Sequence, residues 1–181
     1  IVDTTLGKFG PFAGQTFVGD VGYGANAGIM RVALEKVDGE YQGACFPFVD
    51  NQPLGCERMR FGPDHQLYIA SLTSGLTRLA YVAKTAPLAM KAVHIRPGGN
   101  GFVVHLTKPL AADQKINPAQ FSVARYHYLY TGNYGSPQAD EQAVAVEAAE
   151  LSPDRTQITL TFPVETYPIG MVYAIRVGEL C

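Results

Sequence analysis

Tryptophan is absent from the sequence, cysteine occurs only three times, and charged residues make up only 17% of the 181 residues. A formal net charge of -2 argues against a nucleic-acid partner, and an apolar content of 47% argues against a disordered chain. No apolar run approaches the roughly 20 residues that a membrane-spanning helix needs. We therefore predict a folded protein with no membrane span and no nucleic-acid partner.

Several sequence motifs of catalysis and cofactor binding are also missing. The chain has no CxxCH motif for haem attachment and no G-x-S-x-G nucleophile elbow. The glycine-rich segment DVGYGANAG (20–28) does not have the spacing of a dinucleotide-binding fingerprint. Catalytic and cofactor-binding residues therefore remain unassigned, and we expect no cofactor and no metal in this chain.

The chain does contain the pattern of an all-β protein. Short runs rich in Val, Ile, Tyr, Phe and Thr alternate with turn residues. We predict strands over 15–20, 28–37, 40–49, 56–62, 66–71 and 75–83, and a second series over 89–96, 101–107, 119–130, 143–150, 156–162 and 171–178. The sequence pattern changes after Lys84, where the second series of strands begins, so we predict two domains, 1–83 and 84–181.

The first half contains an internal similarity. Residues 17–20 and 29–32 resemble residues 68–71 and 76–80, which places Arg31 and Arg78 at equivalent positions. A repeat of about 40 to 50 residues built from short strands is typical of a β-propeller blade, although two unrelated hairpins can also look alike by chance. A propeller needs about four to eight blades. Residues 1–83 are therefore predicted to be terminal blades, and the remaining blades, in the same polypeptide or another chain, are the expected partner.

Several longer segments of the sequence resemble a known protein family. The segments GPFAGQTFVGD, IMRVALEKVDGEYQGACFPF, RMRFGPDHQLYIA and GLTRLAYV resemble the closing blades of exported bacterial propellers. That family is similar to the pyrroloquinoline-quinone sugar dehydrogenases and to haem-binding, membrane-bound dehydrogenase-like proteins. The segments FVVHLTKPL, FSVARYHYLYTGNYGSP and LSPDRTQITLTF resemble the β-sandwich that follows the propeller there, and short alternating strands suggest an immunoglobulin-like sandwich.

The resemblance leads to two hypotheses of function. In the first, the chain is the C-terminal part of an exported sugar or alcohol dehydrogenase-like protein, with pyrroloquinoline quinone or haem in blades outside this chain. In the second, it is a non-catalytic extracellular module that binds polysaccharide or a surface protein. Both imply a periplasmic or extracellular location. The start at Ile1, without a methionine or a leader, is interpreted as a removed signal peptide or as a piece of a longer chain.

Two cysteines lie close together in the sequence. Cys45 and Cys56 flank FPFVDNQPLG, which contains turn residues that can bring two antiparallel strands together. We expect a disulfide between them, which fits an oxidising compartment. Free buried thiols and a metal site with His65 are the alternatives, and Cys181 is expected to pair with a cysteine beyond the chain.

Candidate ligand contacts fall in two places. In the first half they are Asp20, Tyr23 and Asn26 of the glycine-rich loop, together with Arg31. For Arg31 and Arg78 we favour an ion pair between blades, with ligand contact as the alternative.

In the second half, Tyr126, Tyr128 and Tyr130 alternate and so share one strand face. They can stack on sugar rings or pack the sandwich against the last blade, and we favour packing. His94 and His105 lie equally far from the centre of the RPGGNG turn, which would put their Cβ atoms roughly 4.5 to 5.5 Å apart. This spacing would allow a shared metal, but we expect a solvent-facing or hydrogen-bonded pair.

Overall fold

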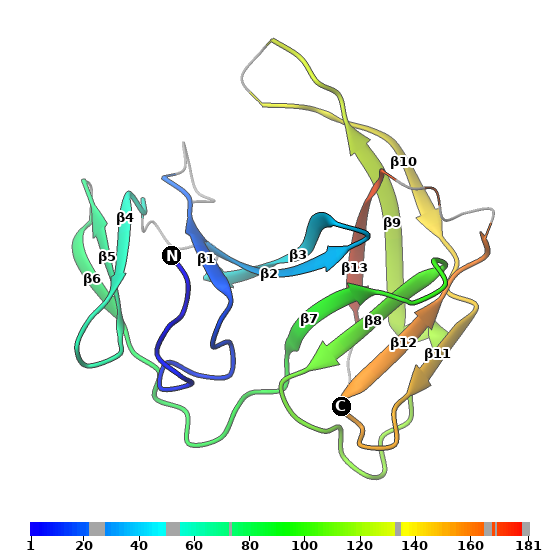
Figure 1. The fold of residues 1–181 in the computed structure, drawn as a ribbon, viewed down its shortest axis with the longest axis horizontal. Helices are drawn as coiled ribbons and strands as arrows, with labels where there is room; N and C mark the ends of the chain where they lie inside the picture. Colours follow the sequence, from blue (N-terminus) through cyan, green and yellow to red (C-terminus); the bar gives the residue numbers. More distant parts are fainter. Residues whose placement is uncertain are drawn as a thin grey trace. The chain divides into compact units, whose positions relative to one another are not determined.

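A computed structural model describes residues 1–21, 28–49, 55–72, 74–132, 135–164, 168 and 170–178 (Figure 1). The prediction of an all-β protein is confirmed, because the described residues form four small antiparallel sheets, none of them closed into a barrel. A 3₁₀ turn, η1 (Pro118–Gln120), precedes the ninth strand. Within the described ranges, no helix is long and apolar enough to cross a membrane.

The chain divides into two compact units, Ile1–Val93 and His94–Cys181, called here the first and the second unit. The first unit holds two three-stranded sheets of consecutive strands. The first of these sheets contains β1 (Thr16–Gly19), β2 (Ile29–Val37) and β3 (Glu40–Val49), and the second contains β4 (Arg58–Phe61), β5 (Leu67–Ser71) and β6 (Gly75–Leu79). All six lie within the expected ranges.

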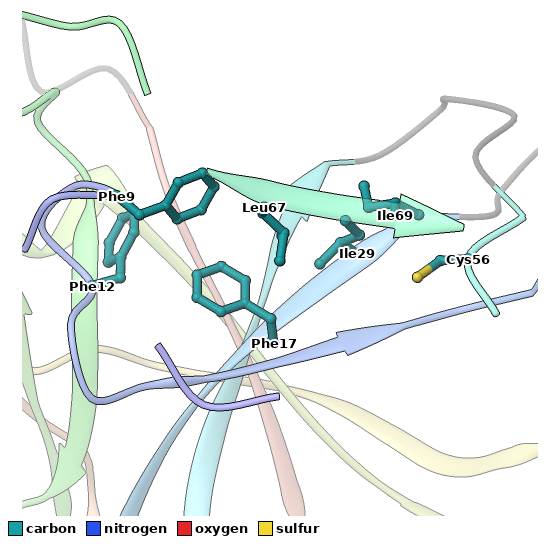
Figure 2. Close-up of a cluster of buried hydrophobic side chains, with 7 residues drawn as sticks. All are labelled: Phe9, Phe12, Phe17, Ile29, Cys56, Leu67 and Ile69. Atoms are coloured by element: carbon teal, nitrogen blue, oxygen red, sulfur yellow. The ribbon is translucent and has the colours of Figure 1, made fainter. Parts of the chain in front are cut away.

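Both sheets of the first unit contribute to one hydrophobic core, shown in Figure 2. Its buried members are Phe9, Phe12, Phe17, Ile29, Cys56, Leu67 and Ile69. Phe17 packs edge-on against Phe9, Phe48 and Phe61, with ring centroids 4.8 to 6.2 Å apart. Each large apolar side chain buried in this way contributes about 1.5 to 3 kcal/mol. The core therefore depends on aromatic residues drawn from both sheets and from the segment before β1.

The second unit contains two further sheets, one with the order β11-β12-β8-β7 and one with the order β10-β9-β13. The strands are β7 (Met90–Ile95), which begins in the first unit, β8 (Gly101–Leu106), β9 (Phe121–Tyr128), β10 (Gln138–Val144), β11 (Ala148–Leu151), β12 (Gln157–Thr161) and β13 (Val172–Val177). Aromatic contacts join the sheets, because Tyr173 of β13 stacks on Phe162 and meets Phe102 of β8 edge-on. Alternate residues such as Val104 and Leu160 are fully buried.

Gly101 allows close approach of two strands in the second unit. A Cβ atom at this position would lie 1.9 Å from the carbonyl oxygen of Leu160 on β12. Real Cβ atoms never come that close, so any side chain at position 101 would push β8 and β12 apart. The pairing of these two central strands therefore requires glycine here.

The strand expected over 143–150 is replaced by two strands. β10 ends at Val144, and β11 begins only at Ala148. Most of β10 is missing from the prediction because its sequence QADEQAV is polar on both faces. A bulge between Ala139 and Gln142, with Asp140 at a φ of 54°, also breaks the two-residue period from which strands are recognised.

The expected disulfide is wrong, because Cys45 and Cys56 are both free thiols. Cys45 follows the two-residue alternation of β3 and points away from the face that carries its buried neighbour Phe46. Cys56 instead lies in the core of the first unit, 4% exposed, and its sulfur packs against Gly19. The two side chains thus occupy opposite sides of a sheet, which residue spacing alone does not reveal.

The two arginines of the internal similarity are not equivalent in the structure. Arg31 pairs across strands with Phe17, and Arg78 pairs with Tyr68, so the register matches. However, Arg31 is buried, whereas the Arg78 side chain is 58% exposed. A one-residue shift in a strand moves every side chain to the other face. The similarity therefore aligns two hairpins whose corresponding residues lie on opposite faces: Arg31 is on the buried face of the first hairpin, and Arg78 is on the exposed face of the second.

Candidate binding surface

The outer face of the sheet β10-β9-β13 carries the most exposed aromatic row of the second unit. Along β9, Phe121 and Val123 are buried toward the opposite sheet. The residues between and beyond them point the other way because side chains alternate along a strand. This alternation puts Tyr126 and Tyr128 on one face, as the sequence predicts, and that face is the outer one.

The tyrosines of this row are arranged as a corner. The rings of Tyr126 and Tyr128 lie 5.4 Å apart between centroids, with their planes at 86°. Tyr128 is 51% exposed, and Tyr130, which follows the end of β9, is fully exposed at 101%. Tyr126, Tyr128 and Tyr130 are called here the tyrosine face. A ligand ring stacked on one of the first two tyrosines would meet the edge or the hydroxyl of the other.

Small side chains form the floor beside the tyrosine face. Ala124 of β9 pairs directly with Ala143 of β10 on one side and with Ala174 of β13 on the other. Three alanines in one row across the sheet present no bulky side chain that could cover the neighbouring rings. The outer face is therefore flat where it meets Tyr126, and Val172, the partner of Tyr126 on β13, is itself 38% exposed.

Opposite charges flank the tyrosine face. The pKa of Tyr126 is raised, first by its hydrogen bond with Tyr128, then by burial and by the nearby charges of Tyr128 and Glu141, while Arg176 opposes the shift. Both Glu141 and Arg176 are exposed. A carboxylate acceptor and a guanidinium donor thus lie close to the same ring.

Among the other predicted contact residues, the two that the structure describes, Asp20 and Arg31, do not form a comparable surface. Tyr23 and Asn26 lie outside the described residues. Asp20 is exposed at the end of β1, where its backbone bonds to Gly28 and to Cys56. The ligand-contact prediction for this loop stays a prediction.

Arg31 is a structural residue in the core of the first unit. It is 3% exposed, and its guanidinium lies between the rings of Phe12 and Phe46, at 3.9 and 4.2 Å from their centroids. It donates to the carbonyl oxygens of Met90 and Lys91 at 2.6 Å, and to the side-chain oxygen of Gln15. Burial lowers the pKa of Arg31 to about 10, so the group stays charged at neutral pH.

The ion pair between blades is wrong for both arginines among the described residues. The hydrogen-bond partners of Arg31 are carbonyl and amide oxygens. Arg78 of β6 instead lies 3.9 Å from Asp64, in the turn that joins β4 and β5 of the same sheet. An exposed pair of this kind contributes only about 0 to 1 kcal/mol.

An apolar cavity in the first unit is a feature that the sequence did not reveal. Its volume is about 280 Å³. Its walls are formed by Phe9, Pro11, Phe12, Phe48, Leu79, Ala80, Tyr81 and Pro87. The only sequence signal is the concentration of proline and aromatic residues before β1 and after β6. With a lining that is almost entirely carbon, this cavity lacks the polar groups that orient a sugar or a cofactor.

Comparison of the chain with protein-family models, with curated proteins and with solved structures finds no match. The relation to the quinone dehydrogenase-like propellers therefore stays a prediction that rests on the similarity of sequence segments. Across the ranges that the structure describes, no group of three or more His, Cys, Asp or Glu side chains could hold a metal ion. The tyrosine face is thus the candidate site that the geometry supports best.

Proposed function

We propose that the second unit is a non-catalytic module that binds polysaccharide on its tyrosine face. The observation that carries this proposal is the exposure of Tyr128 at the end of β9 and of Tyr130 just after it, with Tyr126 between Tyr128 and a flat row of alanines. Exposed apolar surface of this kind marks an interaction site. Tyrosine suits a sugar because its ring covers the C–H face of a pyranose, while its hydroxyl reaches a polar partner.

The flanking charges favour a sugar over a purely apolar partner. Glu141 can accept hydrogen bonds from sugar hydroxyls, and Arg176 can donate to ring or hydroxyl oxygens. Because the two charges are opposite, their sum does not select a strongly acidic or basic ligand. A neutral polysaccharide is the ligand class that fits both the rings and their surroundings.

The strand order of the second unit supports an immunoglobulin-like sandwich. The sheet β7-β8-β12-β11 corresponds to strands A, B, E and D of that fold, and the sheet β10-β9-β13 corresponds to C′, C and F. In this assignment the tyrosine face lies on the outer side of the C′-C-F sheet. This fold is a scaffold, so the function is argued from the surface and not from the fold.

The first unit is proposed to be the terminal part of a β-propeller. Two successive antiparallel meanders, β1-β2-β3 and β4-β5-β6, support this assignment. A propeller blade usually contains four strands, and each described sheet here has three. The dehydrogenase-like parent, with its quinone or haem in other blades, stays a prediction.

Affinity electrophoresis tests the proposed function. The whole chain is run in non-denaturing gels that contain dissolved β-glucan, xylan or mannan, and we expect at least one of them to retard it. The double variant Tyr126→Ala, Tyr128→Ala should lose this retardation, since two stacked rings contribute about 1 kcal/mol each.

Tyr41→Ala is the matched control, because Tyr41 is 74% exposed on β3 of the first unit. Thermal unfolding of each variant shows whether it is folded. An absence of retardation in all three gels contradicts the proposal, as does equal retardation of the wild type and the folded double variant.

A further inference from the structure

Two histidines meet on the sheet β11-β12-β8-β7 of the second unit. The rings of His94 on β7 and His105 on β8 have centroids 4.6 Å apart, and their planes are inclined by 52°. The hairpin that joins them turns through two glycines at positive φ, Gly98 and Gly99. The turn is closed by a hydrogen bond from the Arg96 N–H to the carbonyl of Gly101. The backbone therefore brings the two imidazoles together without a long or irregular connection.

The separation of the two rings matches that of two imidazoles on one metal ion. A metal–nitrogen bond of about 2.0 to 2.1 Å puts the ion roughly 3.2 Å from each ring centroid. With nitrogen–metal–nitrogen angles of about 90 to 110°, the two centroids then lie about 4.5 to 5.2 Å apart. The 4.6 Å observed falls within this interval. In such a complex, one nitrogen of each ring points at the shared ion.

The surroundings of the pair suit a borderline transition metal. His105 lies between the buried residues Val104 and Leu106 along β8, so its ring is on the face away from the core. Directly opposite on β12 is Gln157, whose amide is on the same face. Imidazole ligands favour Zn²⁺, Cu²⁺ and Ni²⁺, whereas Ca²⁺ and Mg²⁺ require several oxygen ligands.

The arginine that shares this face with His94 is already engaged. Arg96 follows His94 by two residues, and its guanidinium donates to the Asn100 side-chain oxygen at 3.1 Å and to Thr161 Oγ1 at 3.0 Å. These bonds hold the positive charge toward the turn and β12. Arg96 therefore repels an incoming metal ion less strongly than a guanidinium that could turn toward the two histidines would.

We propose that His94 and His105 form a two-imidazole site for a divalent transition-metal ion, with Zn²⁺ as the reference ion. The remaining coordination positions are open to water, to the Gln157 amide or to a donor from another molecule. A bound ion would link β7 to β8 and stabilise the hairpin, because binding to the folded state alone adds to its stability. This site does not depend on the proposed carbohydrate function.

The test is a calorimetric titration with Zn²⁺ alone. It uses the whole chain carrying Cys45→Ser, since the exposed Cys45 thiol is itself a zinc ligand. We expect one bound Zn²⁺ per chain. His94→Asn and His105→Asn should each weaken binding by tenfold or more, and an excess of Ca²⁺ should not compete. In two-dimensional NMR spectra, the ring signals of His94 and His105 should be the ones that shift.

The matched control is His127→Asn on β9, where the imidazole lies 3.6 Å from Asp140. It removes one histidine from the same unit and should leave Zn²⁺ affinity unchanged. An absence of binding at millimolar Zn²⁺ overturns the proposal. Equal losses in the control and in the pair variants also overturn it, as does binding that folded His94→Asn and His105→Asn chains retain in full.

Discussion

The two units differ in their main aromatic groups: the first unit has a buried cluster of phenylalanines, whereas the second carries an exposed tyrosine row in addition to its buried aromatic residues. In the first unit, Phe9, Phe12 and Phe17 are no more than 8% exposed and belong to a network of edge-on rings. In the second, Tyr128 and Tyr130 are 51% and 101% exposed on or beside the outer face of a sheet. The difference shows that aromatic content alone does not identify a core. The exposed tyrosines of the second unit are the basis of the proposed binding surface.

The same contrast holds for charge. Arg31 of the first unit is enclosed by rings and carbonyl oxygens, whereas Arg176 of the second is exposed beside Tyr126. A buried charge with fixed partners stabilises the fold, and an exposed one is available to a ligand. The variants below test this division by removing an inward-facing and an outward-facing group in turn.

The largest effect is expected for Phe17→Ala. Phe17 is 0% exposed and contacts three other phenylalanine rings. Its removal should lower the free energy of unfolding by about 3 to 5 kcal/mol, since it leaves a cavity as well as losing burial. Urea denaturation measures the change. Tyr130→Ala, the outward-facing counterpart, should change the same quantity by less than about 0.5 kcal/mol, and a comparable loss in both would remove the distinction.

The next largest effect is expected for Arg31→Met. The substitution keeps an unbranched apolar stem and removes the guanidinium donors, so the carbonyl oxygens of Met90 and Lys91 lose their partners. We expect a loss of about 2 to 4 kcal/mol in the free energy of unfolding. Arg78→Met is the control, with an expected loss of about 0 to 1 kcal/mol. If denaturation curves show the two variants to be equally stable, the structural role of Arg31 is wrong.

A smaller loss is expected for Gly101→Ala in the second unit. The new methyl group would meet the Leu160 carbonyl oxygen at 1.9 Å, so β8 and β12 must shift. We expect a cost of about 1 to 3 kcal/mol, typical of overpacking, measured by thermal unfolding. Gly132→Ala, where nothing lies within 4 Å of the new Cβ, should be nearly neutral. Equal stability of the two variants would argue against the close strand approach.

The smallest effect concerns the thiols and leaves stability unchanged. Cys45 is exposed and Cys56 is buried, so native iodoacetamide labelling should modify Cys45 first. Burial raises the pKa of both thiols, and the reactive thiolate of Cys45 should therefore increase as the pH rises above neutral. Peptide mass spectrometry identifies the labelled residue. A Cys45–Cys56 disulfide in unreduced protein would contradict this arrangement.

Local signals were sufficient to predict most strands. The DG pair between β2 and β3 indicates a tight hairpin, and the structure has Asp38 and Gly39 at φ values of 50° and 91°. β10 escaped prediction because a polar edge strand with a bulge lacks alternation. Sequence-based prediction uses neighbouring residues only. It therefore identifies the DG hairpin, which has a local signal, and misses most of β10, which has none.

The candidate site was predictable only in part. Alternation places Tyr126 and Tyr128 on one face, and the structure has them there. The alanine floor near Tyr126 comes from Ala143 and Ala174, which reach Ala124 through strand pairings between residues far apart in the sequence. The opposite faces of Cys45 and Cys56 and the burial of Arg31 are likewise set by tertiary packing, which sequence spacing does not report.

The measurement that tests the carbohydrate-binding surface most directly is an NMR titration of alanine methyl groups. The protein, labelled at its alanine methyls, is titrated with cello-, xylo- and manno-oligosaccharides in turn. For at least one of these ligands, we predict shifts at Ala124, Ala143 and Ala174, which form the floor beside the tyrosine face. Ala33 and Ala92, buried in the first unit, should not move. Saturating ligands that leave the three floor methyls unchanged would contradict the account.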